Sequence, residues 1–147
     1  MAKSKKKTAK KKAAAPEQID VAVAEVVDLM RINGDFAPAL AEVVERKIAV
    51  AAAKKAGLRV STAELQKAAD GFRALRDLTK ARDTQRWLKA NGITIEALED
   101  YLETNMLISK FKDKLAKSAP KKLTASKAVK DTVRRLAYQT WLATAMK

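Results

Sequence analysis

Apolar side chains recur through most of the chain at the three- and four-residue spacing of an α-helix. The first such stretch places five of them on one helical face: Ile19, Val23, Val26, Val27 and Met30. A helix that buries one side against a neighbour shows this pattern. It predicts a helix over about Glu17–Ile32, and Gly34 suits the left-handed position that follows a helix end.

A second helix is predicted directly after this glycine. Asp35 can cap its N-terminus, and Pro38 suits its first turn, where the missing backbone N–H is not needed. Its predicted buried stripe is formed by five apolar residues: Leu40, Val44, Ile48, Ala51 and Ala52. We expect Gly57 to end this helix.

The spacing of Ser61 and Glu64 predicts a capping box, in which each side chain accepts a hydrogen bond from the backbone of the other residue. The helix that follows is expected to turn four apolar side chains inward: Leu65, Ala68, Phe72 and Leu75. Gly71 lies inside this helix, where glycine costs about 1 kcal/mol relative to alanine. Close approach of a neighbouring helix is one reason for tolerating it.

Two further helices complete the pattern before Pro120 breaks it. A short helix with Trp87 is expected to open at Asp83 or Thr84 and to close at Gly92, and Thr94 caps the next one. The apolar face of that long helix consists of Leu98, Leu102, Ile108, Phe111 and Leu115. A last helix over about Thr124–Met146 offers Val129, Val133, Leu136, Tyr138 and Trp141.

The pattern as a whole predicts an all-α protein, a compact bundle of about five to six helices over residues 16–147. Only four glycines and three prolines occur among 147 residues, which favours helices over sheets. Residues 1–15 carry seven lysines and no acid, so we expect a disordered basic tail there. The formal net charge is +14, and the tail supplies half of it.

The composition removes several kinds of chemistry. The chain has no cysteine, hence no disulfide and no thiolate, and no histidine, the commonest general base and transition-metal ligand. We therefore expect no enzyme activity, no metal and no cofactor. No stretch approaches the roughly 18–20 apolar residues of a membrane span. The basic N-terminus runs into Pro16 without the apolar core of a secretory signal, so we expect a cytoplasmic protein.

Residues 57–115 resemble a known helical module. The residues that carry the resemblance are Val60-Ser61, Glu64-Leu65, Ala68-Ala69, Phe72-Arg73, Thr84, Trp87-Leu88, Glu96, Leu98-Glu99, Tyr101-Leu102-Glu103 and Ile108-Ser109-Lys110. The stretch resembles the SurA-like chaperone domain that lies N-terminal to parvulin-type peptidyl-prolyl isomerases in bacteria. A weaker resemblance continues back through Phe36–Ala56. The catalytic parvulin domain, a sheet-and-helix unit with active-site histidines, has no counterpart in the chain.

The resemblance implies a module that holds unfolded or precursor polypeptide in an apolar helical groove. The residues expected to serve this binding are Phe72, Trp87, Leu88, Tyr101, Leu102, Met106 and Phe111. Most residues at such spacing belong to a core, and the sequence does not separate core from groove. The resemblance also implies that a distant helix, here 124–146, packs back on the module. Exchange of that helix between two copies would give a homodimer.

A second hypothesis assigns the function to the basic residues. The tail lysines are Lys3, Lys5, Lys6, Lys7, Lys10, Lys11 and Lys12, and Met106–Lys147 adds eleven Lys or Arg against two Asp. Such regions attract nucleic-acid phosphates without reading sequence. An acidic face at Glu96, Glu99, Asp100 and Glu103 is explained by favourable interaction with a helix N-terminus, or by docking of a basic peptide.

Overall fold

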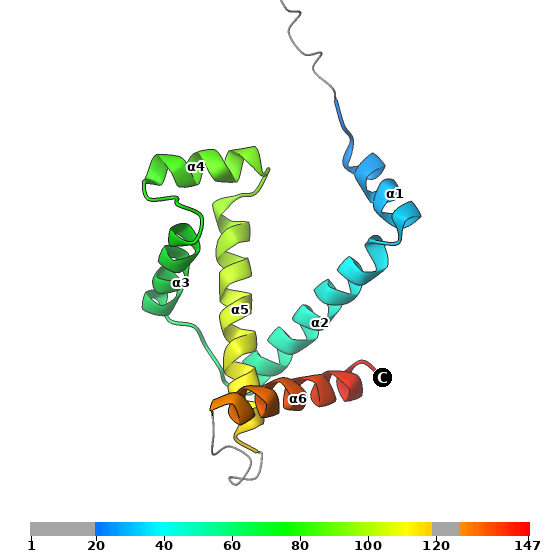
Figure 1. The fold of residues 1–147 in the computed structure, drawn as a ribbon, viewed down its shortest axis with the longest axis vertical. Coiled ribbons are helices and arrows are strands. Elements are labelled where there is room, and N and C mark those ends of the chain that lie inside the picture. Colours follow the sequence, from blue (N-terminus) through cyan, green and yellow to red (C-terminus); the bar gives the residue numbers. More distant parts are fainter. Residues whose placement is uncertain (1–19, 119–126) are drawn as a thin grey trace, which may run out of the picture. The chain divides into compact units, whose positions relative to one another are not determined.

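The computed structural model describes residues 20–118 and 127–147, and within these ranges the chain is built from α-helices and their connections (Figure 1). The helices are α1 (Val23–Asn33), α2 (Phe36–Lys55), α3 (Thr62–Ala74), α4 (Ala81–Ala90), α5 (Ile95–Ala116) and α6 (Lys127–Ala145). The prediction of an all-α protein is confirmed. The tail over 1–15 lies outside the described residues.

The chain divides into two units, of which one ends at Ala37 and the other begins at Pro38. In the first unit, α1 begins at Val23, several residues later than predicted, and Glu25 Oε2 accepts a hydrogen bond from Ala22 N at 2.8 Å. Gly34 ends the helix in the left-handed conformation at φ 82°, as its position predicts. No residue of α1 is buried.

The second unit holds two clusters of buried side chains, both of which include α5. The first, here called the α4 core, joins α3, α4, α5 and the turn before α4. It consists of Phe72, Leu78, Leu88, Leu98 and Leu102, with Leu65, Ala68, Ala69 and Trp87 packed against it. The rings of Phe72 and Trp87 meet edge to face, with centroids 5.3 Å apart. Such pairs add roughly 0.5–1.5 kcal/mol to the burial of their area.

The second cluster, here called the α6 core, joins the C-terminal half of α2 to α5 and α6. Its buried members are Ala53, Leu107 and Phe111, and Tyr138 and Trp141 of α6 pack against them. Phe111 and Trp141 meet edge to face at 4.8 Å. Arg134 of α6 pairs with Asp113 of α5, and its Nη2 donates to Ser109 Oγ at 2.6 Å. The last helix therefore packs back on α5 of its own chain.

Several residues predicted to face inward are exposed. In α2 the buried residues are Ala49 and Ala53, whereas Leu40 is 51% exposed, because the N-terminal half of the helix extends past both cores. Val44 and Leu136 are exposed as well. Leu75 is 86% exposed, since α3 ends at Ala74 and the chain turns away.

Gly71 does not serve a close helix contact. A Cβ built at this position would meet nothing within 4 Å, and the residue is exposed. The expectation of a closely approaching helix is therefore wrong. Because the position is open and helical, alanine would fit there without strain.

The connection between α3 and α4 is held by Arg73. Its Nε donates to Thr84 Oγ1 at 3.1 Å and to the carbonyl of Leu78 at 3.3 Å, and its Nη2 donates to the carbonyl of Thr79 at 3.4 Å. The helix α4 accordingly begins at Ala81, earlier than predicted, and its N-cap residue makes no side-chain capping hydrogen bond. The prediction failed because a side chain from another helix fixes this turn.

The predicted capping box at the start of α3 is confirmed and extended by a lysine from α5. Glu64 Oε2 accepts from Ser61 N at 2.9 Å, and Ser61 Oγ accepts from Glu64 N at 3.2 Å. Lys110 Nζ lies 2.7 Å from Glu64 Oε1 and donates to the carbonyl of Arg59. The hydrogen bonds from Lys110 and Ser61 lower the pKa of Glu64 from 4.5 to about 2.

This lowered pKa predicts a dependence of stability on pH. The unfolded chain binds the proton near pH 4.5 and the folded chain near 2, so the stabilisation is present above pH 4.5 and is lost as the pH falls toward 2. Urea unfolding at pH 6, 3.5 and 2.5 measures the loss. The Glu64→Gln variant should lose less stability over the same range, and an identical pH profile for both proteins would contradict the assignment.

Candidate functional site

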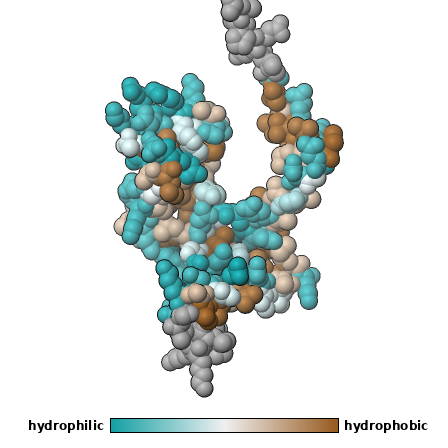
Figure 2. All heavy atoms as spheres, viewed as in Figure 1, coloured by the Kyte–Doolittle hydropathy of each residue, from teal (hydrophilic) through white to brown (hydrophobic). Residues whose placement is uncertain are grey.

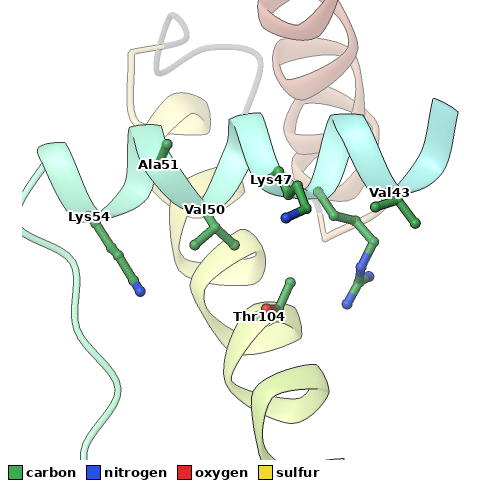
Figure 3. A pocket seen from close by; sticks show the side chains of 7 residues that line it. Val43, Lys47, Val50, Ala51, Lys54 and Thr104 are labelled. Carbon is green, nitrogen blue, oxygen red and sulfur yellow. The ribbon is translucent and has the colours of Figure 1, made fainter. Parts of the chain in front are cut away.

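A groove with an apolar floor and a charged rim runs where α2 passes across α5 in the second unit (Figure 3). It encloses about 480 Å³. Its lining residues are Val43, Arg46, Lys47, Val50, Ala51 and Lys54 from α2 and Thr104 from α5. We call it the α2–α5 groove.

Helical spacing explains why these side chains share one face. Val43, Lys47, Val50 and Lys54 follow one another at intervals of four, three and four residues, which keeps them on one stripe of α2. Figure 3 shows Val50 directed toward Thr104, with Lys54 beside it. This face of α2 therefore alternates valine and lysine.

The charged side chains that line the groove are all positive. Arg46, Lys47 and Lys54 line it, and no carboxylate does. Across the part of the chain that the structure describes, none of these three cations forms an ion pair. The Arg46 guanidinium lies 5.0 Å from the centroid of the Tyr101 ring, a cation–π arrangement. The groove thus offers an apolar floor with a positive rim that no ion pair neutralises within the described residues.

A second hollow of about 350 Å³ begins on the other side of Lys54. Leu58, Val60 and Leu107 supply its apolar surface, and Glu103 supplies a carboxylate. The other members of the predicted acidic face, Glu96, Glu99 and Asp100, are exposed on α5. Exposed charges of this kind are usually solvated, in line with the simpler explanation for that face.

The seven residues predicted to bind polypeptide differ in how far they are exposed to solvent. Phe72, Leu88 and Leu102 are buried in the α4 core, and Phe111 is buried in the α6 core. These four assignments need correction, because a buried side chain has no surface to offer a client. Trp87 and Met106 are half-buried, and neither lines the α2–α5 groove. Tyr101 is 50% exposed and contacts the groove through Arg46.

Except for Ala51, the groove residues of α2 were missed in the sequence, because the predicted stripe of Leu40, Val44 and Ile48 lies beside the stripe that carries Val43, Lys47 and Val50. A signal was present. Valine and lysine alternate on a single face at positions 43, 47, 50 and 54, and a lysine on a packed stripe is rare. The tail lysines proposed for nucleic-acid binding lie outside the described residues.

Other kinds of site find no support in residues 20–118 and 127–147. There, no group of three or more acidic, histidine or cysteine side chains is placed to hold a metal ion. None of the described helices has the length and apolar character needed to cross a membrane. Comparisons with protein-family models, curated proteins and solved structures gave no match to the chain.

Proposed function

We propose that this protein is a non-catalytic polypeptide-binding protein that holds an unfolded or precursor segment in the α2–α5 groove. The observation that carries the proposal is the floor of Val43, Val50 and Ala51 beside three cations that form no ion pair within residues 20–118 and 127–147. The resemblance of residues 57–115 to SurA-like chaperone domains supports it independently. A cytoplasmic location belongs to the same proposal and is tested by cell fractionation.

The proposed mechanism is passive. Apolar side chains of the client bury surface on Val43, Val50 and Ala51, which contributes about 25 cal/mol for each Å² removed from water. Lys47 and Lys54 donate hydrogen bonds to carboxylates or carbonyls of the client and steer its approach. The shallow groove releases the client without an input of energy.

A glutamate in the groove floor should weaken client binding. The Val43→Glu variant places a carboxylate among apolar client side chains, and we expect a loss of affinity of about 10-fold, which corresponds to roughly 1.4 kcal/mol. The measurement is fluorescence anisotropy of a labelled, reduced and carboxymethylated client protein. Val43 is 49% exposed, so the fold should tolerate the change.

The matched control is Val23→Glu in α1, which makes the same chemical change at an exposed valine outside the groove. Its affinity should stay within about twofold of the unchanged protein, the scatter expected of a distant surface site. Equal losses for both variants, or no loss at Val43, would refute the location of the site.

The rival hypothesis, nucleic-acid association through the basic tail and the C-terminal region, is tested with the same client assay. Replacing the seven tail lysines by glutamine should leave the affinity for the client within about threefold of that of the unchanged protein. The affinity for nucleic-acid phosphates should fall steeply, because seven positive charges are lost. The exchanged homodimer also remains a prediction. Sedimentation that shows only monomer at high concentration would exclude it.

A further inference from the structure

The outward face of α4 carries a second set of cations. Arg82, Arg86 and Lys89 are exposed, and at 100° per residue they fall within an arc of about 60°. This arc lies opposite Thr84, Trp87 and Leu88, which face the α4 core or Arg73. Gln85 is exposed at the edge of the same face.

None of these cations takes part in holding the fold. In the described ranges, the cations that pair with carboxylates are Arg31, Arg73, Lys110 and Arg134. Arg82, Arg86 and Lys89 form no ion pair there. The structure describes all of α4, and its one carboxylate, Asp83, is half-buried to the side of the basic arc. The charge on this face is therefore uncompensated.

The position of α4 leaves this face open to a large partner. Within the second unit, α4 lies across the ends of α3 and α5, so that its far side points away from both (Figure 1). Figure 2 shows mainly hydrophilic residues over this end of the unit. The turn before the helix adds Lys80, which is exposed. An acidic partner would meet four cations on one helix and its entry turn.

The dimensions fit duplex DNA. Ten residues span about 15 Å, and a helix with its side chains is about 10–12 Å across, which a major groove about 12 Å wide admits. Arg82 and Lys89 are separated by about 10 Å along the helix axis, so they and Arg86 can reach several phosphates. Gln85 is a residue type that pairs with the edge of adenine.

We infer that the outward face of α4 is a docking surface for duplex DNA, with Arg82, Arg86 and Lys89 on the phosphates. This activity goes beyond the proposed polypeptide binding and uses a different surface. It would tether the protein and its client near DNA. It also differs from attraction by the tail, because it depends on three residues in one helical arc.

The test uses the full chain and a fluorescein-labelled 20-base-pair DNA duplex in an anisotropy titration from 50 to 300 mM KCl. The key variant carries Arg82→Gln, Arg86→Gln and Lys89→Gln. The slope of log K against log salt should fall by about 3, and affinity at 100 mM salt by about 100-fold. The control variant makes the same change in charge away from α4 and from the C-terminal region, at the exposed residues Lys55, Arg59 and Lys67.

The control should lose less than about threefold in affinity, because a distant charge acts only through screened attraction. Equal losses for the two variants would show attraction by net charge and overturn the inference. So would equally tight binding of duplex RNA, whose deep, narrow major groove does not admit a helix. Poly-glutamate that competes as well as DNA would point to an acidic protein instead.

A second variant guards against loss of structure. Arg82→Lys with Arg86→Lys keeps the charges, and should keep the salt slope within about 0.5 of the unchanged protein if phosphates are the target. Circular dichroism should report unchanged helix content for every variant. A lysine variant that binds as weakly as the glutamine variant would contradict phosphate contact.

Discussion

Replacing Phe111 with alanine is expected to lower the free energy of unfolding by about 3–5 kcal/mol. Phe111 is 6% exposed and packs with Ala53 and Leu107, and its ring meets Trp141 edge to face. The substitution removes the transfer free energy of the ring and leaves a cavity where three helices meet. Urea unfolding followed by circular dichroism measures the loss, which is a large part of the roughly 5–15 kcal/mol that stabilises a typical domain.

Two companion variants make this prediction specific. Phe111→Leu keeps most of the volume and should cost less than Phe111→Ala, about 1.5 kcal/mol. Leu136→Ala removes a side chain of α6 that is 52% exposed and should cost under about 1 kcal/mol. A Phe111→Ala loss no larger than that of Leu136→Ala would show that α6 does not pack on α5 as described.

Leu102→Ala should destabilise the α4 core by about 2–5 kcal/mol. Leu102 is buried among Phe72, Leu88 and Leu98, so its removal opens a cavity beneath α4. The exposed Leu75 supplies the matched control, and Leu75→Ala should change stability by less than about 0.5 kcal/mol. Equal effects of the two leucine substitutions would contradict the assignment of Leu102 to the core.

The double variant of Leu102 and Phe111 tests how far the two cores are independent. The residues lie about 13 Å apart along α5, beyond the range at which substitutions usually interact, and they share no packing partner. Their losses should therefore add to within about 0.5 kcal/mol. A clear departure from additivity would mean that the cavity at one site disturbs α5 at the other.

Local chemistry in the sequence predicts the helix ends well. Ser61 with Glu64, and Thr94, form the expected capping hydrogen bonds, and Gly34 and Gly92 take positive φ after the helices they follow. These signals work because a cap depends on a few adjacent residues. The start of α4 was misjudged because Arg73, eleven residues before Thr84, fixes that turn through its side chain.

The candidate site depended on information that periodicity does not contain. The pattern shows that Leu40 and Val44 share a face with other apolar residues, but not that α2 extends past the cores that would cover them. It also assigns Phe111 and Tyr101 to one helix without showing that the first is buried and the second exposed. Whether these side chains are buried depends on where one helix crosses another, and helical periodicity does not specify the crossing points.

The residues that form the α4 core lie closer together in the sequence than those that form the α6 core. The two cores can therefore form at different times during synthesis on the ribosome. The α4 core draws its buried residues from the single stretch Phe72–Leu102, whereas the α6 core needs Ala53 and Trp141 together. At about 5–20 residues per second, Trp141 is added about 1.5–6 s after Phe111. Until α6 has followed, Leu107 and Phe111 lack the side chains that cover them, so we expect the growing chain itself to expose an apolar surface to cellular chaperones.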